Sequence, residues 1–299
     1  MITGIHFLLT YQCTYECDHC FVYASPGSEG TFTVDQLKDV FSEIDKIKTI
    51  EWVYFEGGEP FLFYPLMLEG MKMAKKRKLK IGVVTNCYWA NSIKDAEVWL
   101  KPLKKYGVED LSMSNDQFHQ EDLATSPVNN AVKAAAKLKI PSATIAIEPA
   151  CSMPDDSPQH KGEPVVGGDV RFRGRAVDKL TEGVPRVPAS SFTTCPYEEL
   201  ESPERVHVDP YGNVQVCQGI SIGNFWKQPL SKILGDYKAK SHPICGPLLR
   251  GGPLELARTY GVSIENSYID ACHFCYTVRK NLIGRFPEEL TPRQVYGLK

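Results

Sequence analysis

The sequence predicts an α/β domain built on a parallel β-sheet, either open or barrel-like, followed by a smaller C-terminal domain of different character. In the first half of the chain, short apolar segments alternate with longer segments of helical periodicity, which is typical of strand–helix–strand units. In the C-terminal third this alternation stops and dispersed cysteines follow. The strands of the first domain are expected at 5–10, 51–56, 80–86, 109–114, 142–148 and 168–173.

Five of these strand–helix units are clearly defined. The sixth strand, 168–173, is the weakest because a polar stretch rich in proline and glycine, 151–168, comes before it. Among the helices, 34–47 has the clearest pattern, since six apolar residues share one face and Thr33 with Gln36 has the spacing of a capping box. The other helices are expected at 64–77, after Ser92, and from Pro127 with Ser126 as N-cap.

The second domain is expected to begin at a linker. Residues 184–188 contain two prolines and follow the last helical unit. After them come a predicted β-hairpin at 206–217 and a short helix near 229–238. We therefore divide the chain into a first domain, 1–185, and a second domain, 186–299.

The composition excludes several classes of protein. With 299 residues, 42% hydrophobic and 23% charged, and a net charge of −2, the chain is typical of a soluble globular protein without affinity for nucleic acid. No apolar segment reaches membrane-spanning length, and no secretion signal is expected before the first strand. Ten cysteines without such a signal favour metal ligation in a reducing compartment. A cytoplasmic location in an anaerobic organism is therefore expected.

Three cysteines lie directly after the first predicted strand. Cys13, Cys17 and Cys20 place three thiols on one loop, called here the cysteine loop (residues 13–20). Three thiolates can bind three of the irons in a [4Fe–4S] cluster, which normally takes four cysteines. The next cysteine is Cys87, so one iron would keep an open position for a ligand that is not protein. A zinc site is the alternative, although zinc sites usually show four ligands in paired Cys-x2-Cys units.

A glycine-rich tetrapeptide, Gly57-Gly58-Glu59-Pro60, follows the second predicted strand. Glycine lets the backbone approach a ligand closely, and a glutamate can accept a charge-assisted hydrogen bond from an ammonium group. By itself the tetrapeptide is typical of an ordinary turn. Together with the cysteine loop it resembles the signature of the radical S-adenosylmethionine (SAM) enzymes. The resemblance implies a partial (β/α)6 barrel, a [4Fe–4S] cluster whose open iron binds SAM, and contact of this tetrapeptide with the methionine amino group.

Polar residues end the third and fourth predicted strands, at the edge of the sheet where ligands bind. Thr85 and Asn86 end the third strand, and Ser114 and Asp116 end the fourth. The resemblance implies that the strand-four serine and neighbouring polar groups contact the ribose and carboxylate of SAM, which points to Ser114 first and Asp116 next. His119 keeps two open interpretations, a hydrogen-bonded loop residue or a residue that contacts substrate or moves protons.

Three arginines alternate along the sixth predicted strand, Arg171, Arg173 and Arg175, and would share one face. The resemblance implies that an arginine of this segment pairs with the SAM carboxylate, which a planar guanidinium suits well. The sequence does not distinguish the three, and we name Arg173 as the candidate. The family usually has an aromatic residue before the third cysteine, where this chain has His19, whose flat imidazole can pack in the same way.

The C-terminal third carries a second group of cysteines. Cys195 precedes the predicted hairpin, and Cys217 ends it. Cys272 and Cys275 form a Cys-x2-Cys pair. Four thiolates can close a cluster, and the arrangement resembles the auxiliary-cluster domains called SPASM and its shorter form, twitch. Because the middle block of closely spaced cysteines is missing, the resemblance implies one auxiliary [4Fe–4S] cluster. A zinc site held by the same four cysteines is the alternative.

Three cysteines are not needed as ligands. Cys87 and Cys151 are expected to be small buried hydrophobic residues. Cys245 lies within the second domain. Radical SAM peptide epimerases use a cysteine to donate a hydrogen atom to a substrate radical. Cys245 keeps two open interpretations, such a hydrogen donor or a small buried hydrophobic residue.

The first functional hypothesis is a radical SAM enzyme that cleaves SAM reductively to a 5′-deoxyadenosyl radical and abstracts a substrate hydrogen atom. The resemblance implies peptide maturation by thioether formation, epimerisation or crosslinking, with small-molecule oxidation as the alternative. The partners would be an electron donor such as flavodoxin or ferredoxin, a peptide or small-molecule substrate and, for a peptide, a separate leader-peptide recognition protein. The alternatives from other classes are a non-catalytic iron–sulfur protein and a zinc-structured scaffold.

Overall fold

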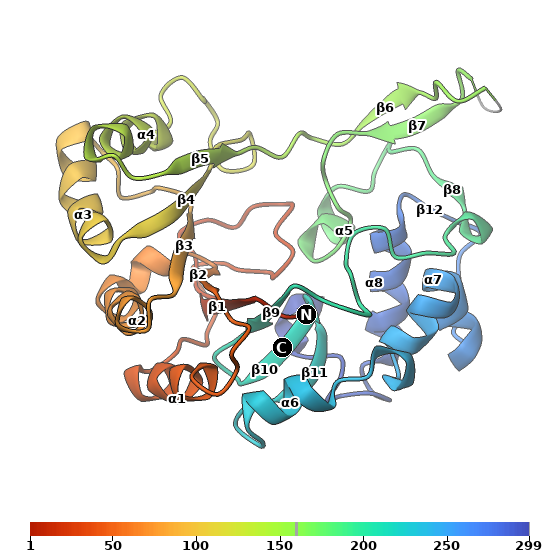
Figure 1. Ribbon diagram of the computed structural model, residues 1–299. Coiled ribbons are helices and arrows are strands. Elements are labelled where there is room, and N and C mark those ends of the chain that lie inside the picture. Colours follow the sequence, from red (N-terminus) through yellow and green to blue (C-terminus); the bar gives the residue numbers. More distant parts are fainter. Residues whose placement is uncertain (159–160, 299) are drawn as a thin grey trace.

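Residues 1–158 and 161–298 are described by the computed structural model, and they confirm an α/β fold with a largely parallel sheet (Figure 1). The main sheet contains β1 (Gly4–Thr10), β2 (Trp52–Gly57), β3 (Lys80–Thr85), β4 (Val108–Ser114), β5 (Ser142–Ile145), β9 (Arg205–Val208), β10 (Asn213–Cys217) and β11 (Ile220–Asn224). Their order is β11-β10-β9-β1-β2-β3-β4-β5. β1 to β5 are parallel, β9 pairs in parallel with β1, and the β9–β10 and β10–β11 pairs are antiparallel.

Helices connect the parallel strands and cover one face of the sheet (Figure 1). They are α1 (Val34–Ile44), the short η1 (Pro60–Phe63), α2 (Tyr64–Lys76), α3 (Ile93–Tyr106) and α4 (Pro127–Leu138). Their buried residues pack against alternate strand residues, as Phe41 of α1 does against Phe7 of β1 with ring centroids 5.3 Å apart. The predicted caps are confirmed, because Thr33 and Gln36 exchange both capping-box bonds and the predicted serines cap α3 and α4.

The prediction of a sixth strand at 168–173 is wrong. The preceding chain forms a separate hairpin, β6 (Cys151–Pro154) with β7 (Pro164–Gly167), which projects from the body of the molecule in Figure 1. Gly168 then takes a positive φ of +86°, which ends the extended segment. The chain continues without helix or strand to α5 (Arg175–Lys179). β5 also ends at Ile145, earlier than expected. With the sixth strand missing, the described residues before β8 contribute five strands to the main sheet.

The C-terminal part adds strands to the same sheet and then packs beside it. The predicted hairpin is confirmed by β9 and β10, and the parallel pairing of β9 with β1 places His207 opposite His6. The predicted short helix is α6 (Leu230–Asp236). The remaining elements are β8 (Val187–Pro188), η2 (Ala189–Ser191), η3 (Ala239–Ser241), α7 (Cys245–Tyr260), β12 (Ser267–Tyr268), α8 (Ala271–Leu282) and η4 (Arg293–Tyr296).

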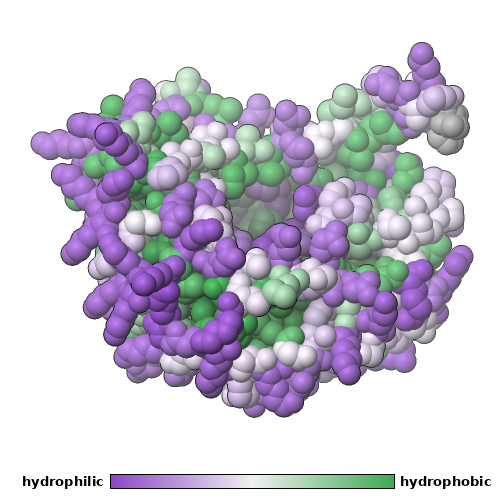
Figure 2. Space-filling model, viewed as in Figure 1, coloured by the Kyte–Doolittle hydropathy of each residue, from purple (hydrophilic) through white to green (hydrophobic). Residues whose placement is uncertain are grey.

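The two faces of the sheet differ in character. On β1, Ile5, Phe7 and Leu9 are fully buried among apolar side chains, whereas His6, between them, points to the opposite, inner face. Figure 2 shows the molecule hollowed near its centre, between the helical side and the C-terminal side. Within the described residues, no helix combines the length and the apolar character needed to cross a membrane.

Candidate active site

The inner face of the sheet opens into a cavity of about 750 Å³, called here the barrel cavity. It lies at the carboxyl ends of β1 to β4, where parallel α/β folds bind ligands, and its volume is typical of small-molecule sites. Most site residues predicted from the sequence line it: Cys13, Cys17, Cys20, Gly57, Gly58, Thr85, Asn86, Ser114, Asp116, His119 and Arg173. The structure therefore brings together residues from four separate strand ends.

The cysteine loop is held in place by an arginine and by N–H groups directed at its sulfurs. Arg175 is buried and donates to the Cys17 carbonyl at 2.7 Å, so this arginine supports the loop. A backbone N–H points at Cys20 Sγ at 3.3 Å, and Asn86 Nδ2 points at Cys13 Sγ at 3.6 Å. Hydrogen bonds to sulfur tune iron–sulfur clusters, so these contacts fit a thiolate-bound cluster.

The spacing of the sulfurs separates a cluster from a single zinc ion. Two sulfurs bound to one zinc at about 2.3 Å lie about 3.8 Å apart in tetrahedral geometry. The described residues contain two groups of three His, Cys, Asp or Glu side chains whose ligand atoms all lie within 4.8 Å of one another. Neither group contains a cysteine. The three sulfurs of the cysteine loop therefore do not all lie within 4.8 Å of one another in the described structure, which is wider than the spacing of ligands on one zinc ion. A [4Fe–4S] cluster binds its cysteines through different iron atoms and fits the wider spacing.

The glycines of the tetrapeptide allow β2 to end against the start of the cysteine loop. A Cβ on Gly57 would collide with the Thr10 carbonyl, and one on Gly58 would collide with the Gln12 carbonyl; Gly57 also has a φ of +131°. The Gly58 N–H donates to Thr10 at 2.7 Å, and the Glu59 N–H donates to Gln12 at 2.9 Å. The backbone of the tetrapeptide is thus tied to the segment that leads into the cysteine loop.

The Glu59 carboxylate is bonded within the scaffold, and its expected contact with the SAM ammonium stays a prediction. It is fully buried and accepts hydrogen bonds from the Phe61 N–H at 3.0 Å, the Thr85 hydroxyl at 2.9 Å and the Asn86 N–H at 2.8 Å. Burial raises the pKa of Glu59 to about 7, although these hydrogen bonds act in the opposite direction. Glu59 therefore caps η1 and joins the end of β2 to the end of β3.

Asp116 organises the loop after β4. Its Oδ1 lies 2.7 Å from His119 Nδ1, and its Oδ2 accepts from the Ile147 N–H at 3.2 Å. Burial raises the pKa of Asp116, but the contacts with His119, His19 and the Ile147 N–H together outweigh it, so the pKa lies below its ordinary value. His19 packs on Phe118 with ring centroids 4.5 Å apart, and burial lowers the pKa of His19 to about 4. The His19 ring is therefore neutral at pH 7, and it packs at a tilt of 34° to the Phe118 ring.

Arg173 lies between the barrel cavity and a second cavity, and it lines both. Its Nη1 donates to Glu198 at 3.2 Å and to Cys217 Sγ at 3.4 Å, and its guanidinium lies over the Phe21 ring. Its buried Nε–H has no hydrogen-bond partner among the described residues. Because buried donors are nearly always paired, this N–H fits an anionic ligand. The neighbouring Arg171 stacks on a tyrosine ring instead.

The second cavity is lined by the four cysteines expected to hold an auxiliary cluster. These auxiliary cysteines are Cys195, Cys217, Cys272 and Cys275. Two arginines, Arg173 and Arg279, line the same cavity, and Arg279 is almost fully buried. Buried positive charge beside four thiols would offset the negative charge of thiolate ligands. In the described part of the chain no three of these sulfurs lie within 4.8 Å of one another.

The three remaining cysteines lie in different surroundings. Cys87 is buried just after β3, as predicted, whereas the prediction for Cys151 is wrong, because it is exposed on β6. Cys245 is fully buried at the start of α7, near Tyr237 and the auxiliary cysteines, and burial raises its pKa to about 12. It is not among the described residues that line the barrel cavity. A hydrogen donor must reach the substrate, so the structure does not favour that role for Cys245.

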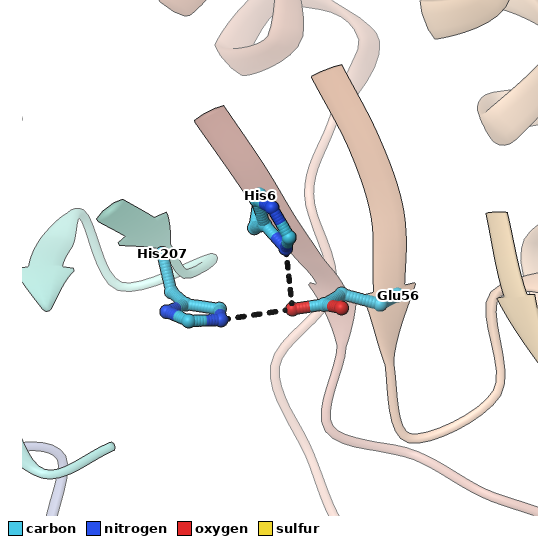
Figure 3. A group of neighbouring side chains, drawn as sticks. All are labelled: His6, Glu56 and His207. Carbon is cyan, nitrogen blue, oxygen red and sulfur yellow. Dashed lines mark ion pairs between the residues drawn. The ribbon is translucent and has the colours of Figure 1, made fainter. Parts of the chain in front are cut away.

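Sequence reasoning missed three polar residues on the inner face of the sheet, His6, Glu56 and His207 (Figure 3). A local signal existed, since His6 and Glu56 each interrupt a predicted apolar strand at an inward-facing position. Their meeting with His207 depends on the pairing of β1 with β9. That pairing joins opposite parts of the chain and leaves no local pattern.

The sequence profile of the Radical SAM superfamily matches residues 7–144. Residues 7–144 form a radical SAM domain. It contains the cysteine loop, the tetrapeptide and the polar ends of β3 and β4, and the family's cofactors are SAM and a [4Fe–4S] cluster. The spread of the three sulfurs and the N–H groups directed at them fit that cluster.

Relatives of known name extend over different parts of the chain. The peptide biosynthesis protein YydG of Bacillus subtilis (strain 168) is 22% identical over 259 residues, covering 87% of this chain and 74% of that protein. The tungsten-containing aldehyde ferredoxin oxidoreductase cofactor-modifying protein of Pyrococcus furiosus is 28% identical over 109 residues, covering 36% of this chain and 29% of that protein. Among crystal structures, BtrN in complex with AdoMet and 2-DOIA aligns with a TM-score of 0.51 at 15% identity, covering 78% of this chain and 82% of that one. This last likeness supports the fold alone.

Proposed function

We propose that this radical SAM enzyme modifies a peptide by radical chemistry, with thioether formation, epimerisation or crosslinking as the reaction types. The observation that carries the proposal is the similarity over most of the chain to YydG, which is named for peptide biosynthesis.

An exposed edge of the main sheet also supports a peptide substrate. β5 is the outer strand of the main sheet and is exposed, and its continuation, residues 145–147, lines the barrel cavity. An extended peptide can pair with such an open edge and place one residue in the cavity.

The residues at the strand ends would hold the cofactors. Cys13, Cys17 and Cys20 would bind the cluster, and SAM bound to its open iron supplies the 5′-deoxyadenosyl radical once a flavodoxin or ferredoxin delivers an electron. The backbone of Gly57 and Gly58, both in the cavity wall, would approach the methionine part of SAM.

Three polar groups at the cavity wall would orient the rest of SAM. Ser114 and Asn86 offer uncharged hydrogen-bonding groups there. The unpartnered Nε–H of Arg173 would donate to the SAM carboxylate. Asp116 would act mainly through the loop it organises, because both of its oxygens are already occupied.

We further propose that the four auxiliary cysteines hold one [4Fe–4S] cluster. Two buried arginines beside the four thiols support this assignment, since they supply the positive charge that a thiolate-bound cluster needs. A cluster with four protein ligands has no open iron for SAM. It would therefore serve electron transfer or the stability of the C-terminal part.

The test is reductive SAM cleavage followed by turnover of a peptide. The protein is reconstituted with iron and sulfide without oxygen, reduced with dithionite, and assayed for 5′-deoxyadenosine. Peptides encoded beside the gene are then added in deuterated water. Uptake of solvent deuterium indicates epimerisation, and loss of hydrogen mass indicates a thioether or a crosslink.

Each outcome has a definite meaning. Formation of 5′-deoxyadenosine with conversion of a peptide supports the proposal. Oxidation of a small alcohol in place of any peptide would replace it with small-molecule chemistry. A reduced, iron-loaded protein that never releases 5′-deoxyadenosine would make the chain a non-catalytic iron–sulfur protein.

A further inference from the structure

Glu56 lies between two imidazoles on the inner face of the main sheet (Figure 3). His6 Nδ1 lies 3.3 Å from Glu56 Oε1, and His207 Nε2 lies 3.1 Å from the same oxygen. The three residues come from the adjacent strands β1, β2 and β9, and we call them the His–Glu–His cluster. None of them belongs to the cysteine loop or to the auxiliary cysteines.

The distances from the Glu56 oxygen to the two histidine nitrogens match those between ligands of a single metal ion. All three of these atoms lie within 4.8 Å of one another. Two ligands bound to one ion at about 2.1 Å lie about 3.0 Å apart at a right angle and about 3.4 Å apart at the tetrahedral angle. The two measured N···O distances, 3.1 and 3.3 Å, fall within that range. Two imidazoles and one carboxylate are also the ligands of catalytic zinc sites and of non-haem iron(II) sites.

Several buried atoms at the cluster have no hydrogen-bond partner among the described residues. They are His6 Nδ1, His207 Nδ1 and Gln218 Oε1. His207 and Gln218 are 5% and 6% exposed, and the Gln218 amide lies 3.5 Å from His207 Nε2. A cation beside Glu56 would give His6 Nδ1 a partner, whereas His207 would bind it through Nε2 and not through the unpaired Nδ1.

We propose that the His–Glu–His cluster binds one divalent transition-metal ion, zinc or iron(II), at the wall of the barrel cavity. Glu56 lines this cavity, whereas His6 and His207 are not among the described residues that line it, so an ion bound to the Glu56 carboxylate would lie beside the space proposed for a substrate. A metal with three protein ligands and an open position can bind a further ligand. The ion would take a carbonyl, carboxylate or hydroxyl oxygen of the substrate and hold the substrate in place. The proposal depends neither on a peptide substrate nor on SAM cleavage.

Zinc binding to the iron-loaded protein tests the proposal. The protein is treated with EDTA to remove weakly held metal, mixed with an equal amount of Zn²⁺, desalted and analysed for zinc and iron. We expect about one zinc per chain with unchanged iron, and zinc–nitrogen or zinc–oxygen distances of about 2.0–2.1 Å in X-ray absorption at the zinc edge. His207→Ala and Glu56→Gln should each retain less than about a tenth of the zinc, because three-ligand sites lose affinity steeply when one ligand is removed.

Tyr54→Phe is the matched control. Tyr54 stacks on His6 with ring centroids 4.4 Å apart but contributes no ligand atom to the cluster. This variant should bind zinc as the wild type does, and unchanged iron content in all variants shows that the fold and both thiol sites are intact. Equal zinc in wild type and His207→Ala, a zinc–sulfur distance of about 2.3 Å, or no zinc retained by the wild type would each overturn the proposal.

Discussion

Arg173 donates a hydrogen bond to the sulfur of Cys217 at 3.4 Å. The same arginine lines the barrel cavity, so one side chain contacts the surroundings of both proposed clusters. Burial lowers the pKa of Arg173, but the nearby cysteines and Glu198 raise it above its ordinary value, so the guanidinium keeps its charge. A fixed positive charge beside a sulfur ligand stabilises the more negative, reduced state of a cluster.

Arg173→Gln should therefore lower the reduction potential of the auxiliary cluster. A hydrogen bond from a charged group contributes about 1.5–3 kcal/mol, which corresponds to roughly 60–130 mV for a one-electron couple. Glu198 pairs with Arg173 and offsets part of this charge, so we expect the lower end of the range. Potentiometric titration followed by electron paramagnetic resonance measures the shift. Arg171→Gln is the control, because Arg171 stacks on Tyr197; an equal shift in both variants would contradict a specific role for Arg173.

Replacement of Cys13, Cys17 and Cys20 by alanine should abolish SAM cleavage. All three line the barrel cavity, and without them the first cluster has no protein ligands. Iron should fall by about four per chain, and the auxiliary cluster should remain. Iron analysis and assay of 5′-deoxyadenosine check both points. Cys151→Ala, on the exposed β6 strand, should change neither. Continued release of 5′-deoxyadenosine from the triple variant would refute the assignment.

Cys272→Ala combined with Cys275→Ala should halve the iron content and lower the stability of the C-terminal part. The second cavity would lose two ligands from α8, and the two cysteines that remain beside the two buried arginines are too few to hold the cluster. SAM cleavage should survive in soluble protein, while product formation should fall. Mössbauer spectroscopy and limited proteolysis provide the measurements. Unchanged iron, or zinc bound at these cysteines in the wild type, would remove the auxiliary cluster.

Glu59→Gln should change the pH dependence of stability more than it changes SAM binding. Burial raises the pKa of Glu59 from 4.5 to about 7, so the folded state holds a proton that the unfolded state has already released. The stabilisation by Glu59 is thus complete below about pH 4.5 and is lost as the pH rises through 7. Between these values the wild type should lose roughly 3 kcal/mol of unfolding free energy relative to Glu59→Gln.

Denaturant titrations of wild type and Glu59→Gln across this pH range measure the difference. Glu121→Gln, at an exposed position, should follow the wild type. SAM affinity of folded Glu59→Gln should fall by less than the roughly tenfold expected for the loss of a direct charged hydrogen bond. A larger loss of affinity, with unchanged stability, would show that the carboxylate reaches SAM after all.

Local signals were sufficient for the elements that surround the cysteine loop. The alternation of segments 5–10, 51–56, 80–86 and 109–114 with amphipathic helices matches β1 to β4, because strand and helix periodicity are properties of neighbouring residues. The caps at Thr33, Ser92 and Ser126 were predictable for the same reason. The three closely spaced cysteines and the glycines after β2 were recognised from the sequence as site residues, and they line the barrel cavity.

Features that depend on distant contacts could not be predicted in this way. The segment 168–173 alternates like a strand, but Gly168 turns the backbone, and Arg175 reaches back to the cysteine loop. The orientation of the Glu59 side chain is set by its hydrogen bonds to the Phe61 N–H and to Thr85 at the end of β3. The sequence motif does not contain this information. The His–Glu–His cluster forms only when β9 joins β1.

The pairing of β9 with β1 also affects how the chain folds during its synthesis on the ribosome. β1 has β2 on one edge and β9 on the other, so its second edge is covered only when residues 205–208 emerge. Ribosomes add about 5–20 residues per second, so on the order of ten to forty seconds pass between the synthesis of β1 and that of β9. During this time one edge of β1 has no partner strand. An open apolar strand edge pairs readily with other chains. A nascent chain, or a fragment cut at residue 185, therefore carries an aggregation-prone edge that the finished protein conceals.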